Sequence, residues 1–305
     1  MDVPARLATL ALAAVCLALP ASAAAQVTFS NNNGITINDG NCTSTNQVQA
    51  QAAPYPSTIA VSGLAGQVAD VDVSLTGFSH TAPSDARVLL VGPQGQTTLL
   101  LHENGALVGV ADLNLTFDDA AAQSPPTDGG TSLESSRYKP SNQSEGALSC
   151  GFFSADTAFP STAPAGPYGS MLAAFNGSNP NGAWSLYVVD TAGADVGTIS
   201  GWSLVLSIRP AAVDDSPSRI NEDSGAHLFR VLANDLNADG GPLVVQSVSD
   251  PAHGTAVVAN AGKRVSYTPD ADYCNPDPQP DDTFTYTLNG GSTSTVSVNV
   301  KCVDG

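Results

Sequence analysis

The hexapeptide DLNADG, which begins at Asp235, carries the clearest chemical signal in the sequence. Asp235, Asn237 and Asp239 alternate along it and Gly240 follows, as at positions one, three, five and six of a calcium-binding loop. The twelfth position is Gln246 rather than the bidentate glutamate of an EF-hand, and strand-like sequence flanks the loop. We therefore expect either a β-type calcium turn or an Asx-rich turn that needs no metal.

Three short fragments resemble the motifs of the subtilisin catalytic triad: YGSMLAA with Ser170, VVDTAG with Asp190 and HGT with His253. Their order along the chain differs from that family, although a triad is defined by geometry and occurs in several orders. The surrounding sequence argues more strongly against a triad, because the fragments lie within β patterns of two different predicted domains. We predict that they form no triad and that the protein is not an enzyme.

The other three histidines also lack the neighbours that nucleophilic catalysis requires. His80, His102 and His227 lie beside predicted strand ends, with no cysteine, serine or carboxylate motif at catalytic spacing. We predict that they are ordinary surface or edge residues.

The charge balance of the chain excludes one large class of partners. Only 10 Lys and Arg face 28 Asp and Glu among 305 residues, which gives a net charge of -18. Such a surface repels phosphate backbones, so we predict no nucleic-acid partner. The same excess attracts divalent cations, or serves solubility alone.

The first 25 residues are typical of a secretory signal peptide. Arg6 precedes an apolar run at 7–19, and small residues lead to a cleavage site near Ala25. The apolar run is too short to span a bilayer, so we predict secretion without membrane insertion. We exclude residues 1–25 from the fold.

Four cysteines follow this leader and predict disulfides in an oxidising compartment. Three pairings are available to four cysteines. The pairing that respects the domain division predicted below joins Cys42 to Cys150 and Cys274 to Cys302.

The mature sequence is all-β in character, with short runs of Val, Leu, Ile and Thr between turn residues and no stretch of helical period. Residues 70–78 alternate strictly, residues 86–102 predict a hairpin, and residues 112–119 alternate again. The stretch 182–206 contains both tryptophans, Trp184 and Trp202, each on the aliphatic face of its predicted strand. We predict that both indoles pack in the core of a sandwich rather than stack on a ligand.

The first domain resembles the P domain of proprotein convertases in its bacterial, secreted form. The segments that carry this resemblance are FSHTAPSDARVLLVGPQGQTTLLL (78–101), LTFDDAA (115–121), YKPSN (138–142), PAGPYGSMLAAFNGSNPNG (164–182) and the repeated tripeptide WSL. The resemblance implies a jelly-roll, galactose-binding-like β-sandwich over residues 26–208, of the kind that packs against a subtilisin-like protease. The chain departs from the family at Ser84, Asp85 and Ala86, where a G-D-L usually stands.

The second domain resembles the cadherin-like, Ig-like repeat modules of bacterial surface proteins, after a linker at 209–213. The matching segments are AVDDSPSRINEDS (212–224), VLANDLNADGGPLVVQSVSDPAHGT (231–255), VSYTPDADY (265–273) and DDTFTYTLNGGSTSTVSVNV (281–300). The resemblance implies a smaller β-sandwich over residues 214–305. It also implies calcium at the domain junction, with Asp214, Asp215 and Glu222 as further candidate ligands.

Together these features predict a secreted, non-catalytic protein for extracellular binding or adhesion, with an unidentified protein or glycan partner and calcium as a stabilising ion. One alternative is an accessory P domain that docks on a separate subtilisin-like serine protease. Another is a carbohydrate-binding module, for which Tyr55, Tyr138 and Tyr168 are the loop aromatics. The fold alone does not choose among these functions.

Overall fold

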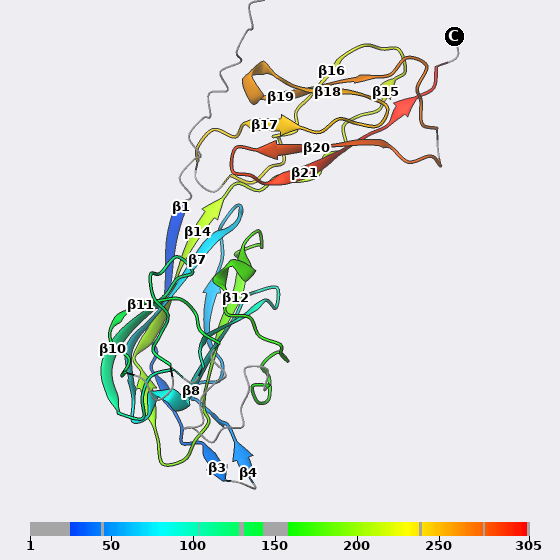
Figure 1. Cartoon of the computed structure of the whole chain (residues 1–305). Coiled ribbons are helices and arrows are strands. Elements are labelled where there is room, and N and C mark those ends of the chain that lie inside the picture. Colours follow the sequence, from blue (N-terminus) through cyan, green and yellow to red (C-terminus); the bar gives the residue numbers. More distant parts are fainter. Residues whose placement is uncertain are drawn as a thin grey trace, which may run out of the picture.

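The computed structural model describes residues 25–43, 46–102, 104–127, 131–142, 158–237, 240–276 and 278–303. Apart from three short 3-10 turns, the elements in these ranges are β-strands. They form two β-sandwiches that meet at the end of strand β14 (Figure 1). The all-β prediction with two sandwiches is confirmed. Residues 1–24, which hold most of the predicted signal peptide, lie outside the described ranges.

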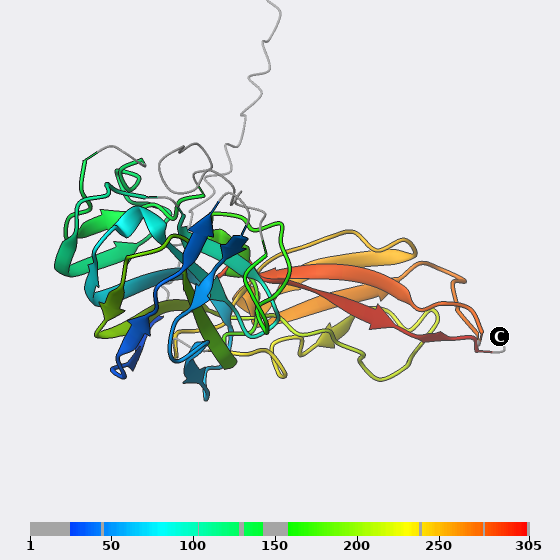
Figure 2. The same ribbon diagram turned by 90° about the horizontal axis from the view of Figure 1, so that it is seen from below.

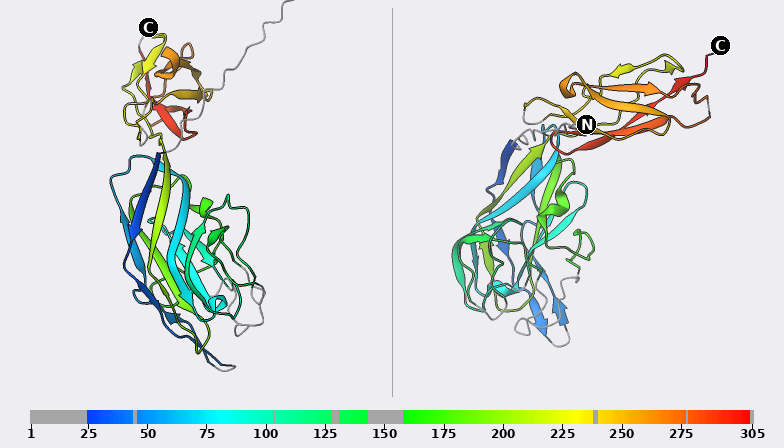
Figure 3. Two further views of the ribbon diagram at one scale, coloured as in Figure 1. Left: turned by 90° about the vertical axis from the view of Figure 1, so that its left-hand side faces the viewer. Right: turned by 45° about the horizontal axis from the view of Figure 1, so that its top comes forward.

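The first sandwich packs a larger sheet against a smaller one, and the two layers are visible from two directions in Figure 3. The larger sheet has the order β1 (Ala25–Asn31), β14 (Gly201–Arg209), β7 (Gln67–His80), β10 (Val110–Phe117) and β11 (Ser136–Tyr138), with β2 (Ile35–Ile37) and β13 (Gly197–Ile199) beside it. The smaller sheet has the order β5 (Ala50–Gln51), β12 (Gly182–Asp190), β8 (Ala86–Val91) and β9 (Thr97–Leu101), with β6 (Ser57–Val61) paired to β12. Strands β3 (Asn41–Thr43) and β4 (Asn46–Val48) form a separate pair, and η1 (Pro83–Asp85) and η2 (Leu172–Phe175) are 3-10 turns.

Both tryptophans lie in the core between these sheets, as predicted. Trp184 and Trp202 are almost completely buried within one apolar cluster. Each indole N–H also has a partner, since Trp184 Nε1 donates to the Pro180 carbonyl at 2.9 Å and Trp202 Nε1 donates to Ser57 Oγ at 3.0 Å. Large aromatic surface and a satisfied polar atom together make these residues effective in a core.

A β-bulge at Gly77 changes which side chains of β7 point into the core. Its pairing with β10 shifts by one residue between Leu75 and Phe78, and Gly77 has a φ of 65°. Glycine adopts this left-handed conformation without a steric cost, which makes it suited to a β-bulge. The extra residue turns both Phe78 and His80 into the core.

The outer face of the smaller sheet is also covered. Tyr187 and Val189 of β12 point away from the main core, but they are buried in a second apolar cluster with Phe159 and Tyr168. Arg87 of β8 is fully buried there, and its guanidinium lies 4.5 Å from the centre of the Phe159 ring. The loop that ends at Tyr168 therefore forms a third layer on this side.

The second sandwich places two three-stranded sheets face to face, and Figure 2 shows them as the elongated half of the molecule. One sheet has the order β16 (His227–Phe229), β19 (Arg264–Pro269) and β18 (Gly254–Ala259), and the other β17 (Val245–Val248), β20 (Asp282–Leu288) and β21 (Thr293–Val298). Strand β15 (Ile220–Asn221) pairs in parallel with β22 (Val300–Lys301), and η3 (Asn260–Gly262) joins β18 to β19. The core contains Tyr267, Tyr286 and the alternate apolar residues of β20 and β21.

The segment between the sandwiches is held by the second one. Ala211 pairs with Leu236 in an isolated antiparallel bridge, and the backbone N–H of Ala212 donates to Ser292 Oγ at 2.9 Å. The predicted linker 209–213 is therefore partly built into the Ig-like domain. In the described ranges, no helix has the length and apolar character needed to cross a membrane.

Candidate functional site

A buried histidine–aspartate pair joins the two sheets of the first sandwich. His80, at the end of β7, and Asp190, at the end of β12, have fully buried side chains, and His80 Nε2 lies 3.0 Å from Asp190 Oδ2. A Cβ at Gly197 of the neighbouring β13 would lie 2.3 Å from His80 Cδ2. Only a glycine at this position lets β13 pass this close to the imidazole ring of His80.

Both ring nitrogens of His80 face protein groups. The backbone N–H of Ala82 donates to Nδ1 at 3.2 Å, so this network assigns the ring proton to Nε2, on the side of Asp190. A general base must present an acceptor nitrogen to the proton of a substrate. His80 presents neither nitrogen to solvent, and the pair therefore serves the structure of the sandwich.

The three triad-like fragments are not assembled. Asp190 has His80 as its histidine neighbour, while His253 lies in the other sandwich, where its ring stacks on Tyr273 at a centroid distance of 4.2 Å. Ser170 follows the buried Tyr168 in the loop before η2.

Asp85 lies in the same buried region and has a strongly shifted pKa. It is 1% exposed, and burial, reinforced by the negative charges of Asp190 and Asp195, raises its pKa to about 7. Burial also raises the pKa of the Asp190 carboxyl. The backbone carbonyl of Asp85 accepts hydrogen bonds from the N–H and the hydroxyl of Thr191, both at 3.0 Å, which fixes η1 against the end of β12.

The sequence did not reveal this cluster, because all three remaining histidines were predicted to be ordinary surface or edge residues. That prediction is wrong for His80 and His102, which are 2% and 0% exposed. The signal that could have corrected it for His80 is Gly77, since a glycine inside an alternating strand marks a bulge. His227 is partly exposed, and its Nε2 lies 2.7 Å from Ser224 Oγ.

The predicted calcium loop packs against the segment that enters the second sandwich. Ala211 and Leu236 exchange two backbone hydrogen bonds of 3.0 and 2.9 Å. Asp235 Oδ1 accepts a hydrogen bond from Val213 N at 2.8 Å and another from the Tyr286 hydroxyl at 2.7 Å. The first carboxylate of the loop therefore fixes the path of the junction.

Three oxygens of this region receive no hydrogen bond among the described residues: Asp215 Oδ2, Asp235 Oδ2 and Asn237 Oδ1, all shielded from solvent. Burial, reinforced by the charges of Asp235 and Asp214, raises the pKa of Asp215 to about 6, although a hydrogen bond from Tyr286 opposes the shift. Carboxylate and amide oxygens are the ligands that calcium prefers. The three donor-free oxygens are therefore of the chemical type that binds a divalent cation.

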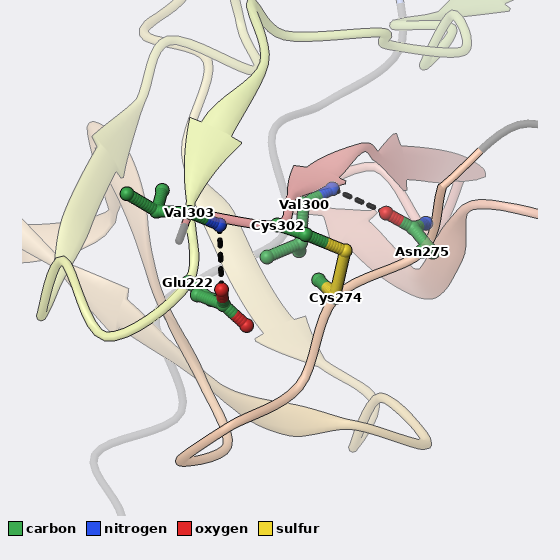
Figure 4. The surroundings of a disulfide bond; sticks show 6 residues. All are labelled: Glu222, Cys274, Asn275, Val300, Cys302 and Val303. Atoms are coloured by element: carbon green, nitrogen blue, oxygen red, sulfur yellow. Dashed lines mark hydrogen bonds between the residues drawn. A yellow bond between two sulfur atoms is a disulfide. The ribbon is translucent and has the colours of Figure 1, made fainter. Parts of the chain in front are cut away.

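The other predicted ligands are placed differently. Asp214 Oδ1 accepts a hydrogen bond from Thr295 N at 2.9 Å at the edge of β21. Glu222 Oε1 accepts one from Val303 N at 2.6 Å beside the disulfide (Figure 4). Asp239 lies outside the described residues. Within the described ranges, no three His, Cys, Asp or Glu side chains are grouped so as to hold a metal ion, so a site here depends on Asn237 or on further oxygens.

The predicted bridge between Cys274 and Cys302 is confirmed, with Cα atoms 5.0 Å apart. It lies next to β22, where Asn275 and Val300 exchange hydrogen bonds (Figure 4). Cys150 and the side chain of Cys42 lie outside the described residues, so their pairing stays a prediction.

The loop tyrosines do not form a sugar-stacking surface. Tyr138 and Tyr168 are each 3% exposed, and the Tyr168 hydroxyl donates to the Pro164 carbonyl. Tyr55 packs edge-on against Tyr187 at 5.0 Å and donates to the Pro160 carbonyl at 2.9 Å. All three rings serve packing, contrary to the surface role expected of them.

Two family models match the chain, in the order that the sequence predicted. Residues 163–206 match the proprotein convertase P-domain, and residues 208–302 match the bacterial Ig domain. No curated protein matches the chain.

Two solved structures with partial similarity are those of the serine protease of Aeromonas sobria, alone and in complex with its chaperone. The complex is 16% identical and covers 60% of this chain with a TM-score of 0.25. The protease alone is 14% identical and covers 61% with a TM-score of 0.27. The chain spans only 27% of either structure. At these TM-scores neither supports an argument about this chain.

Proposed function

We propose that this protein is a secreted, non-catalytic binding protein in which a P-domain-like sandwich and an Ig-like sandwich present surfaces to an extracellular partner. The observation that carries this proposal is the closed environment of His80 and Asp190, since the one histidine–carboxylate pair in the described residues has no face toward solvent. The disulfide between Cys274 and Cys302 supports an oxidising compartment.

Binding is tested by capture from the culture supernatant of the source organism. The protein without its first 25 residues is immobilised, and retained proteins and glycans are identified in calcium and in EDTA. A specific partner, retained by the protein and not by a heat-unfolded control, supports the proposal. Hydrolysis of casein by the purified protein that is lost in Ser170→Ala or Asp190→Asn would overturn it.

A second candidate function is that of an accessory domain for a secreted serine protease. The observation that favours it is the match of residues 163–206 to the proprotein convertase P-domain. The test is co-elution of the protein with a subtilisin-like protease from the same organism, with a raised unfolding temperature of the protease as the expected result. Separate elution and an unchanged unfolding temperature would exclude this function.

Calcium is proposed as a stabilising ion at the junction. Asp215, Asp235 and Asn237 would hold it through the oxygens that lack donors, and the bound ion would offset the repulsion between the carboxylates. We expect calcium to raise, and EDTA to lower, the unfolding midpoint of the Ig-like domain. Asp235→Asn should reduce this response, whereas Glu222→Gln, whose carboxylate accepts a hydrogen bond from Val303 N beside the disulfide, should retain it. An equal midpoint in calcium and EDTA would contradict the site.

A further inference from the structure

Three cationic side chains of the second sandwich line one cavity. Arg230 directly follows β16, Arg264 begins β19 and Lys263 precedes it. Together with Leu232 and Ala233 they line a space of about 300 Å³. The whole chain has only 10 Lys and Arg, so three of them around one cavity are a strong local concentration of positive charge.

None of these three cations has a carboxylate partner among the described residues. The ion pairs found there involve His80 and Arg137, and no side-chain hydrogen bond is formed by Arg230, Lys263 or Arg264. Carboxylates outnumber cations by 28 to 10 in this chain. Among the described residues, the lack of ion pairs at this cavity is therefore not a consequence of a shortage of carboxylates in the chain.

Two of the cations also lie at adjoining ends of paired strands. Phe229 of β16 pairs with Val265 of β19, so Arg230, the first residue after β16, and Arg264, the first residue of β19, lie near each other and line the same cavity. Phe229 and Val265 are buried, and the alternation of strand side chains puts the two arginines on the outer face. Like charges on neighbouring strands repel each other and destabilise a sheet. A bound anion between them would remove this repulsion.

From this arrangement we propose that the cavity is a binding site for a tetrahedral oxyanion, a sulfate or phosphate group, either free or carried on a sugar. Two guanidinium groups and one ammonium offer donors from different directions, which suits an anion with three or more terminal oxygens. The cavity is larger than one such group and matches the lower end of the range for small-ligand pockets. The apolar atoms of Leu232 and Ala233 would lie against the carrier.

The sheet that carries the site forms the outer layer of the second sandwich in Figure 1, where the β17–β20–β21 sheet lies between it and the first sandwich. The net charge of -18 repels long polyanions. Both features favour a single charged group on a small or sparsely charged molecule over a nucleic acid.

The test is isothermal titration calorimetry at fixed ionic strength with five probes: inorganic sulfate, inorganic phosphate, glucose 6-sulfate, glucose 6-phosphate and glucose. We expect saturable binding of at least one sulfate or phosphate probe and none of glucose. Tighter binding of a sugar ester than of the matching inorganic ion assigns the sugar-borne group as ligand, and equal or weaker binding assigns the free anion.

Matched variants locate the site. Lys263→Gln and Arg264→Gln should each weaken binding about tenfold or more, as expected for a lost charge-assisted hydrogen bond. Lys139→Gln makes the same change of charge at an exposed residue of the first sandwich and should leave the affinity unchanged. Far-ultraviolet circular dichroism confirms that each variant is folded. No binding at millimolar probe, or equal weakening in Lys139→Gln, would overturn the proposal.

Discussion

His80 Nε2 and Asp190 Oδ2 approach to 3.0 Å at the ends of two strands that belong to opposite sheets, with no solvent around either side chain. Burial of such polar groups is tolerated because the Ala82 N–H satisfies the other ring nitrogen and the backbone N–H groups of Ala192 and Gly40 donate to Asp190 Oδ1. The pair fixes the position of one sheet relative to the other.

The nearby Asp85 predicts a pH dependence of stability. Its pKa is raised to about 7 in the folded protein, whereas an aspartate in an unfolded chain titrates near ~4. Between these values the native state holds a proton that the unfolded state has lost, so the free energy of unfolding should fall as pH rises from ~4 to about 7. Urea unfolding at a series of pH values measures this slope. Asp85→Asn lacks the titration and should flatten the curve; parallel curves for the two proteins would contradict the shift.

Removal of an indole from the core should destabilise the first sandwich strongly. Trp184→Ala deletes a fully buried ring and its hydrogen bond to Pro180, and we expect a loss of about 3–5 kcal/mol in the free energy of unfolding. Fluorescence of the remaining Trp202 follows the transition in urea. Met171→Ala, at a side chain that is 62% exposed, is the control and should change stability by less than about 0.5 kcal/mol. Similar losses in both variants would argue against the core role.

The disulfide should stabilise the second sandwich alone. Cys274 and Cys302 are 28 positions apart, and the loop-entropy relation gives about 3–4 kcal/mol for a loop of this length. The double variant Cys274→Ser, Cys302→Ser should lower the unfolding midpoint of the Ig-like domain, because its core is separate from that of the first sandwich. Differential scanning calorimetry resolves the two transitions. A shift of both by the same amount would show that the sandwiches unfold as one unit.

The proximity of Arg230 and Arg264 in one cavity predicts a gain of stability when one of the two charges is removed. In anion-free buffer, Arg264→Gln should raise the free energy of unfolding by about 0.2–1 kcal/mol, because it removes the repulsion from Arg230. Arg137→Gln is the contrasting variant, since Arg137 contacts the carboxylates of Asp118 and Asp72, and it should lower stability or leave it unchanged. Thermal unfolding of both variants shows whether each substitution raises or lowers stability. A loss of stability in Arg264→Gln at least as large as that in Arg137→Gln would contradict the repulsion.

Alternation of side chains was enough to predict β7, β10 and the core positions of Trp184 and Trp202, because the period of two fixes which face of a strand is buried. It failed at His80, because the bulge at Gly77 adds one residue and reverses the faces beyond it. Tyr168 was missed for a different reason: the loop before it folds back on a sheet, and such a contact leaves no periodic trace in the sequence.

The candidate sites were predicted only in part. The regular spacing of the loop drew attention to Asp235 and Asn237, and the structure adds the oxygens that lack donors. Spacing alone could not place Glu222, which bonds to Val303 beside the disulfide. Arg230 and Arg264 are separated by more than 30 positions in the sequence, so their proximity depends on the pairing of β16 with β19 and could not be predicted before that pairing was known.

The bond between Cys274 and Cys302 also determines how the protein responds to mechanical tension. A tensile force transmitted from β14 to the chain beyond Cys302 would bypass residues 275–301, because the covalent crosslink carries the load between its two ends. The 28 positions that it encloses would otherwise extend by roughly 95 Å at about 3.4 Å per residue. The crosslinked part of the Ig-like domain therefore adds no length under force, and any lengthening must come from the strands outside the crosslinked loop.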